Sequence, residues 1–195
     1  MNLDELKSII QGHMTDGLLL VVGSGLSAAE GIPGMSELAG HLEANIGTFS
    51  TTSEWATLSN AIKSLGLESA LLQHPPSPQA ESLIGSLTTE FIELHEREVI
   101  QAVFQGTKTL RLSRLLGKLM IPSTGLPVVT TNYDRLVEVA AEEAGKGVDT
   151  LFNGRFSAPF DPDASAESFC TGIALKGGTR TPTRQMKERV TVFKP

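Results

Sequence analysis

The stretch at residues 18–38, LLLVVGSGLSAAEGIPGMSEL, constrains the fold of this chain more than any other. Five consecutive apolar residues lead into a glycine turn and then into a helix start, the pattern of a buried parallel strand followed by a phosphate-binding loop. Gly23 permits the turn, Gly25 lets backbone N–H groups approach an anion, and Ala28 allows helix and strand to pack closely. The helix dipole and its unpaired amides then face the ligand.

A second cluster of helix-breaking residues, Gly31-Ile32-Pro33-Gly34, limits the first helix to about two turns. Glycine pairs after an apolar run also serve ordinary turns, so the loop alone does not define a dinucleotide site. A Rossmann dehydrogenase would place an acidic residue about 20 positions further on, at the end of a second strand. Glu43 has that spacing but lies inside a predicted helix, so we assign it no ribose role.

Length and composition fit one soluble domain, because 195 residues with 40% hydrophobic content can bury a core. A formal net charge of −6 argues against nucleic-acid binding, which needs clustered Lys and Arg. The single cysteine, Cys170, rules out an internal disulfide and a four-cysteine zinc site, and we expect no metal. No apolar run is long enough for a bilayer and the N-terminus is acidic, so we expect a cytoplasmic protein without membrane contact.

Periodicity predicts an α/β fold, a Rossmann-like parallel sheet with an inserted helical subdomain. Asn2 and Glu5 have capping-box spacing at the start of a helix over residues 2–14. The other predicted helices span residues 36–46, 53–65, 67–72, 79–104, 112–119 and 136–144, and the predicted strands span 18–22, 126–130, 148–152 and 190–193. The helical block at 53–119 forms either a cap over the ligand end of the sheet or plain packing material. Residues 153–188 have few apolar repeats and are predicted to form a long loop.

The second informative stretch, LPVVTTNYDRL at residues 126–136, is an apolar strand that runs into polar residues and a helix. Ligands bind at the carboxyl ends of parallel strands in open α/β sheets, so we expect Asn132 to lie beside the loop at residues 23–27. The structural alternative is that Asn132 caps the helix and Asp134 complements its dipole. The presence of both stretches in one chain favours a functional site.

Together, GSGLSAAEGIP at residues 23–33 and TTNYD at residues 130–134 resemble the sirtuin family of NAD-consuming enzymes, most closely the sirtuin-like NAD hydrolases of bacterial anti-phage defence. The resemblance implies catalysis by Asn132 with support from Asp134. It implies NAD as substrate, held by a cofactor-binding set of residues: Gly23, Ser24, Gly25, Ser27, Ile32, Pro33 and Thr131. NAD or ADP-ribose as ligand and a homo-oligomeric assembly also follow from the resemblance.

Three departures from the family pattern limit what the resemblance implies. Gly34-Met35-Ser36 stands where protein-deacylating sirtuins carry Asp-Phe-Arg, and one cysteine cannot supply their zinc module, so both features count against deacylation. The general-base histidine of the family follows a strand like residues 190–195, whereas all four histidines here precede Asn132. We therefore expect an N-terminal portion of a longer protein, incomplete at the C-terminus, with a further domain or partner and no activity by itself.

Two other functions stay open at this level. One is a non-catalytic module that binds NAD or ADP-ribose and controls a partner, and the other is an NAD-dependent protein deacylase. The residue that follows Pro195 discriminates the hydrolase from the sensor, because the hydrolase needs a histidine there. Without the resemblance, the residues alone predict an α/β fold that binds a phosphate-bearing ligand.

Overall fold

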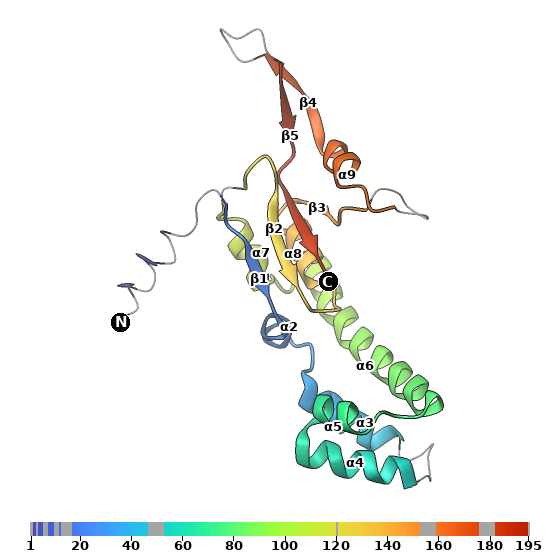
Figure 1. The fold of residues 1–195 in the computed structure, drawn as a ribbon. Coiled ribbons are helices and arrows are strands. Elements are labelled where there is room, and N and C mark those ends of the chain that lie inside the picture. The colour runs from blue at the N-terminus through green and yellow to red at the C-terminus, as the bar shows by residue number, and fades with distance from the viewer. Residues whose placement is uncertain are drawn as a thin grey trace. The chain divides into compact units, whose positions relative to one another are not determined.

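A computed structural model describes residues 2, 4, 5, 8, 9, 12, 17–46, 53–119, 121–152, 159–175 and 182–194. The chain forms two compact units, each described here by itself (Figure 1). We call Met1–Gly23 with Gly106–Pro195 the sheet unit, and Ser24–Gln105 the helical unit. The helical block predicted at residues 53–119 contributes to both units, because its last helix belongs to the sheet unit.

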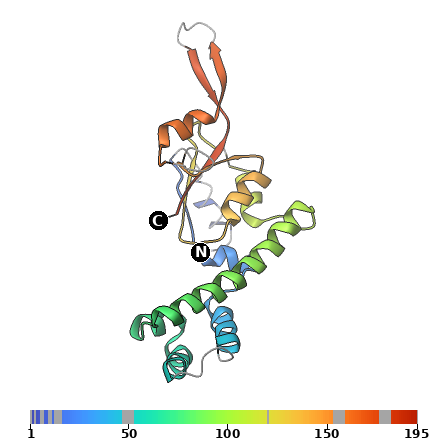
Figure 2. The same cartoon turned by 90° about the vertical axis from the view of Figure 1, so that its right-hand side faces the viewer.

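The sheet unit is built on four parallel strands in the order β1-β2-β6-β3, which confirms the α/β class with a parallel sheet. The strands are β1 (Leu20–Val22), β2 (Leu126–Thr130), β3 (Gly147–Asp149) and β6 (Arg189–Phe193). Val128, Val190 and Val192 lie at the centre of the sheet and are almost fully buried, as expected for β-branched residues in inner parallel strands. Helices α8 (Leu136–Glu143) and α9 (Pro162–Ser168) lie on opposite sides of this sheet (Figure 2).

Helix α7 (Arg111–Leu116) packs beside α8 and joins the core of the sheet unit. Leu112 and Leu116 are buried on one helical face, four residues apart in the manner of an amphipathic helix. The carboxylate of Glu143, at the end of α8, accepts hydrogen bonds from the backbone N–H of Leu110 and from the hydroxyl of Ser113. These bonds join the start of α7 to the end of α8.

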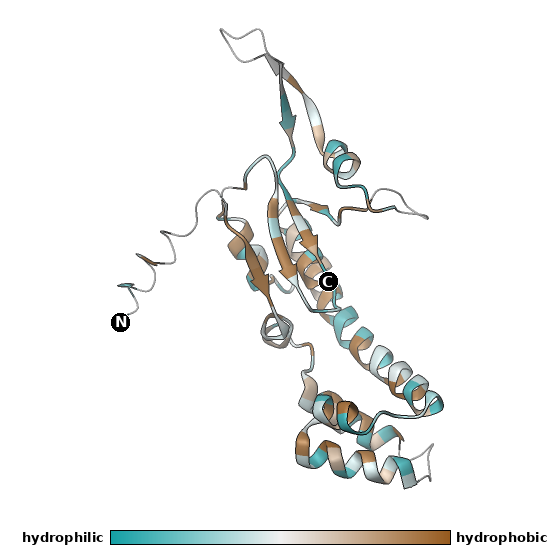
Figure 3. Ribbon diagram, in the orientation of Figure 1, coloured by the Kyte–Doolittle hydropathy of each residue, from teal (hydrophilic) through white to brown (hydrophobic). Residues whose placement is uncertain are grey.

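The helical unit contains α2 (Ser24–Ala29), α3 (Met35–Ile46), α4 (Ser53–Leu65), α5 (Leu67–Gln73) and α6 (Pro78–Phe104). Its core consists of aliphatic side chains from α3 to α6: Leu38, Leu42, Ile46, Leu58, Ala61, Ile62, Leu67, Ala70 and Ile84. Figure 3 shows apolar and polar residues alternating along α6, as on an amphipathic helix. Ser77 caps α6 and also donates its hydroxyl to Glu54, which ties α6 to α4.

The structure confirms most predicted elements and corrects three: the helix predicted at 112–119, which ends at Leu116 as α7, the third strand, and the loop predicted at 153–188. The predicted helices at 36–46, 53–65, 67–72, 79–104 and 136–144 agree with α3, α4, α5, α6 and α8. The third strand covers Gly147–Asp149, a shift of the predicted 148–152 toward the N-terminus. The capping box is confirmed, because Asn2 and Glu5 exchange side-chain to backbone hydrogen bonds of 2.9 and 2.8 Å. Much of the predicted 2–14 helix, His13 included, lies outside the described residues.

The prediction of a long loop at residues 153–188 is wrong. This segment contains α9 and an antiparallel hairpin of β4 (Cys170–Leu175) and β5 (Pro182–Met186). The described hairpin side chains are mostly exposed, so the strands carry little of the apolar alternation on which strand prediction depends. Helix α9 does have a local start signal, since Asp161 accepts a hydrogen bond from Ala164 N at 3.0 Å and Pro162 follows it.

Helix α2 ends in a Schellman motif that gives the Gly-Ile-Pro turn a structural basis. Gly31 has a φ of +96°, and the backbone N–H groups of Gly31 and Ile32 donate to Ala28 O and Ser27 O at 3.1 and 3.0 Å. Ile32, which follows Gly31, is buried at 5% exposure. The cap confirms the prediction of a first helix of about two turns.

We predict that Gly31→Ala lowers the free energy of unfolding by about 1–2 kcal/mol, because a Cβ is disfavoured at positive φ. Gly40→Ala is the matched control, since Gly40 lies inside α3 with open space around its Cβ position. The control should raise stability by about 0.5–1 kcal/mol. Urea unfolding of both variants measures the two effects, and equal shifts in one direction would contradict the assigned role of Gly31.

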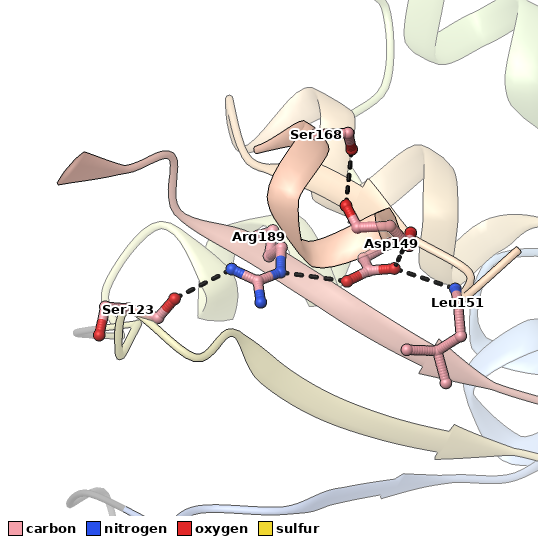
Figure 4. A network of polar contacts seen from close by, with 6 residues as sticks. Ser123, Asp149, Leu151, Ser168 and Arg189 are labelled. Carbon is pink, nitrogen blue, oxygen red and sulfur yellow. Dashed lines mark hydrogen bonds and ion pairs between the residues drawn. The ribbon is translucent and has the colours of Figure 1, made fainter. Parts of the chain in front are cut away.

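A buried ion pair joins β3, β6 and α9 (Figure 4). Asp149 and Arg189 are 2% and 5% exposed, and Arg189 Nε donates to Asp149 Oδ2 at 3.1 Å. The other carboxylate oxygen accepts from Ser165 Oγ at 2.7 Å and from Leu151 N at 2.9 Å. Arg189 Nη1 donates to the backbone oxygen of Ser123 at 2.9 Å, which adds the loop before β2 to the network.

Removing one partner of this pair should destabilise the sheet unit more than removing both charges. We predict that Arg189→Met lowers the free energy of unfolding by about 3–5 kcal/mol, because it leaves the Asp149 charge buried and uncompensated. The double variant Arg189→Met with Asp149→Asn should recover part of that loss, since the introduced carboxamide is uncharged and can still accept from Ser165. Additive losses in chemical denaturation would show that the two charges are not coupled.

Candidate functional site

The candidate site lies where β1 and β2 end side by side. The strands pair in parallel with Val22 opposite Thr130, so the residues that follow each strand emerge at the same edge of the sheet. Asn132 Nδ2 donates a hydrogen bond of 2.9 Å to the backbone oxygen of Gly23. The expected approach of Asn132 to the start of the glycine loop is therefore present within the sheet unit.

The turn after β2 is held by hydrogen bonds from within its own sequence. Asn132 N donates to Thr130 Oγ1 at 3.1 Å, and Leu136 N donates to Asp134 Oδ1 at 3.1 Å at the start of α8. Asn132 and Asp134 are each 8% exposed. The structural alternative thus applies to Asp134, which bonds the first turn of α8, while the side chain of Asn132 reaches across to the end of β1.

Lys194 is a site residue that sequence reasoning missed. It follows β6, the neighbour of β2 on the side away from β1, and its Nζ donates to the backbone oxygen of Asp134 at 2.6 Å. The same ammonium group pairs with Glu138 Oε1 on α8 at 2.8 Å. A cation directly after the predicted strand at 190–193 was the available signal, because that strand ends at the same sheet edge as Asn132.

Tyr133 stands out on the surface of the turn. It is 98% exposed between two nearly buried neighbours, and Thr131 is exposed as well. The turn therefore presents alternate side chains to solvent and to the protein. The two exposed residues and the buried carboxamide of Asn132 occupy one edge of the sheet.

The remaining predicted ligand residues belong to the helical unit. Ser24 and Gly25 are exposed at the start of α2, Ser27 and Ile32 are each 5% exposed, and Pro33 is half-buried. Of the predicted cofactor-binding residues, the sheet unit contains Gly23 and Thr131.

Neither Gly23 nor Gly25 has a positive φ, and a Cβ at either position would meet no atom within 4 Å. The backbone conformation therefore does not require glycine at these two positions. Their lack of a side chain leaves the backbone at the end of β1 accessible, as the predicted approach of an anion would need.

The described residues of the sheet unit contain no histidine. His41, His74 and His95 all lie in the helical unit, and His13 lies outside the described residues. His41 stacks on Phe91 with ring centroids 4.2 Å apart, and His95 packs edge-on against the same ring, which accounts for both side chains by packing. The site as described offers a carboxamide, carboxylates, hydroxyls and a lysine for chemistry.

Within the described ranges, no group of three or more His, Cys, Asp or Glu side chains is arranged to hold a metal ion. Over the same ranges, no helix combines the length and the apolar character that crossing a membrane requires. Neither the models of known protein families nor the curated proteins give a match to this chain.

We predict that Lys194→Met loosens the turn at residues 131–134. The variant loses the donor to Asp134 O and the ion pair with Glu138, and it leaves the partly buried Glu138 carboxylate without that cation. The free energy of unfolding should fall by about 1–3 kcal/mol, and amide exchange at Leu136 should accelerate. Lys187→Met is the matched control, because Lys187 is exposed and should tolerate the change. Equal exchange rates of the Leu136 amide in both variants would show that Lys194 does not hold the turn.

Proposed function

We propose that the chain is the NAD-binding part of a sirtuin-like hydrolase that cleaves NAD to nicotinamide and ADP-ribose. The hydrogen bond from Asn132 Nδ2 to Gly23 O carries the proposal, because it brings the carboxamide of the second motif to the first residue of the glycine loop. The two motifs were identified separately in the sequence, 109 residues apart. Their meeting at one sheet edge supports a shared ligand.

The chemistry suits the residue types at this edge. Nicotinamide leaves NAD from a cationic ring, so cleavage of the glycosidic bond needs no general acid and depends on stabilising an oxocarbenium-like transition state. Asn132 supplies a donor and an acceptor on one side chain, which can orient a ribose hydroxyl or the attacking water. Orientation accelerates the reaction where it is tighter in the transition state than in the ground state.

In this proposal the other residues bind and position the substrate. The loop of Gly23, Ser24, Gly25 and Ser27 holds the diphosphate with backbone amides and hydroxyls, at a distance from the bond that breaks. Asp134 and Lys194 fix the turn that carries Asn132, because Asp134 Oδ1 accepts from Leu136 N at the start of α8 and Lys194 donates to Asp134 O. Ile32 and Pro33 border the ligand pocket, as the resemblance implies. The resemblance further implies a cytoplasmic protein that forms homo-oligomers and acts in anti-phage defence.

A second candidate is a module that binds NAD or ADP-ribose without cleaving it. One observation favours it: the described sheet unit holds no histidine, so no imidazole base accompanies Asn132 there. A sensor needs the phosphate loop and the carboxamide but no proton acceptor. The two candidates share the ligand and differ in turnover. The deacylase is disfavoured by Gly34-Met35-Ser36 and by the single cysteine.

We predict that Asn132→Ala lowers NAD hydrolysis about 10²- to 10³-fold in a version of the chain that continues past Pro195. The reason is the loss of the group that orients the reacting ribose or water. Asn60→Ala on the surface of α4 is the matched control and should leave the rate unchanged. Chromatographic measurement of nicotinamide and ADP-ribose gives the rates. Undiminished NAD loss in Asn132→Ala would reject the catalytic role.

Calorimetric titration of the 195-residue chain separates the two candidates. Binding of NAD and ADP-ribose with no nicotinamide release, in both the short and the extended chain, would favour the sensor. Absence of any binding in both chains would contradict the hydrolase and the sensor together.

A further inference from the structure

A hollow on one face of the sheet shares no lining residue with the edge where Asn132 sits. Its volume is about 330 Å³, at the small end of the range for ligand cavities. Pro127 and Thr191 pair across β2 and β6 and point to one face of the sheet, and Phe193 follows on that face two residues later. Pro162 and Ala166 of α9 line the hollow from the other direction.

The hollow contains polar groups without protein acceptors. Arg189 lines it and is 5% exposed, yet only Nε and Nη1 of its guanidinium donate hydrogen bonds, to Asp149 and to Ser123 O. Nη2 has no hydrogen-bond partner among the residues that the structure describes, and in Figure 4 it points away from both bonded groups. The hydroxyl of Thr191, which is 8% exposed, also has no described partner. Neither atom is among the described buried polar atoms that lack a partner, so both are open to the hollow, where a ligand can replace water as their hydrogen-bond partner.

The charge of the hollow favours an uncharged ligand. Asp149 neutralises Arg189 at 3.1 Å, and these two are the charged residues that line the hollow. An anionic ligand would place a second negative charge beside the buried Asp149 carboxylate, where repulsion is poorly screened. A neutral carbonyl oxygen can accept from Nη2 without that repulsion.

The hollow also has apolar walls. Phe193 is 39% exposed, and Pro127, Pro162 and Ala166 add rigid apolar surface without long flexible side chains. Aromatic rings stack well on such surfaces, and a carbonyl on the ring would point to the polar end of the hollow. Thr191 can accept from an amide N–H group or donate to an oxygen.

We propose that this hollow is a binding site for a small uncharged aromatic amide, with the amide carbonyl on Arg189 Nη2 and the amide nitrogen on Thr191 Oγ1. The site is separate from the proposed NAD site and does not depend on it. The nicotinamide that NAD cleavage would release is one member of this chemical class. A site of this kind would let such an amide bind while the sheet edge at Asn132 is occupied.

The test compares benzamide with benzoate, which differ in charge and share ring size, by calorimetry and by NMR on the 195-residue chain. We expect saturable benzamide binding and at least roughly tenfold weaker benzoate binding. Thr191→Val should weaken benzamide binding about 2- to 12-fold, the contribution of one hydrogen bond, with an unchanged urea midpoint because the hydroxyl has no described partner. Ala166→Leu should block the site by filling it.

Thr89→Val on the exposed face of α6 is the matched control and should bind benzamide as the unaltered chain does. Absence of benzamide binding would overturn the proposal, as would binding that neither Thr191→Val nor Ala166→Leu changes. Benzoate binding as tight as that of benzamide would overturn the assigned class in favour of an anion. NAD titration of Thr191→Val should give the affinity of the unaltered chain, so a failure of the NAD proposal would be seen separately.

Discussion

The parallel pairing of β1 with β2 is the constraint on which the candidate site depends. Val22 opposite Thr130 fixes where each strand ends, and the bond from Asn132 Nδ2 to Gly23 O then closes the gap between the two turns. Val128, Val190 and Val192 point to one face of the inner strands and are buried there, while Pro127, Thr191 and Phe193 lie on the opposite face. The packed core therefore determines the position of the polar edge.

The sequence predicted the parts of this site that depend on where individual strands end. Apolar strands that end in glycine or in polar residues predicted both the sheet and the edge at which Gly23 and Asn132 meet, because the carboxyl ends of parallel strands gather together. The order of the strands was not predictable, since β6 lies between β2 and β3 although it follows both in the chain. Lys194 was missed for that reason: its bond to Asp134 O exists only because β6 is the neighbour of β2.

The segment at residues 153–188 shows where pattern reasoning fails physically. Periodicity reports burial, and β4 and β5 form a two-stranded ribbon whose described side chains are mostly exposed, so no alternation was present to detect. The ion pair between Asp149 and Arg189 could not be predicted for a different reason. Asp149 ends β3 and Arg189 begins β6, and charged residues at strand ends are usually exposed. The two charges meet because β3 pairs with β6 in the register that places Gly147 opposite Arg189.

The same ion pair links stability to the second hollow. Arg189 uses Nε and Nη1 to join β3 and the loop before β2, and this fixed geometry leaves Nη2 oriented without further ordering at the moment of binding. A buried pair of charges is a poor source of net stability compared with apolar packing. In the proposal, the same pair also holds a hydrogen-bond donor in place beside the Thr191 hydroxyl. The carboxyl edge of the sheet and one of its faces would then serve different ligands through the same principle, polar groups held rigid by strand register.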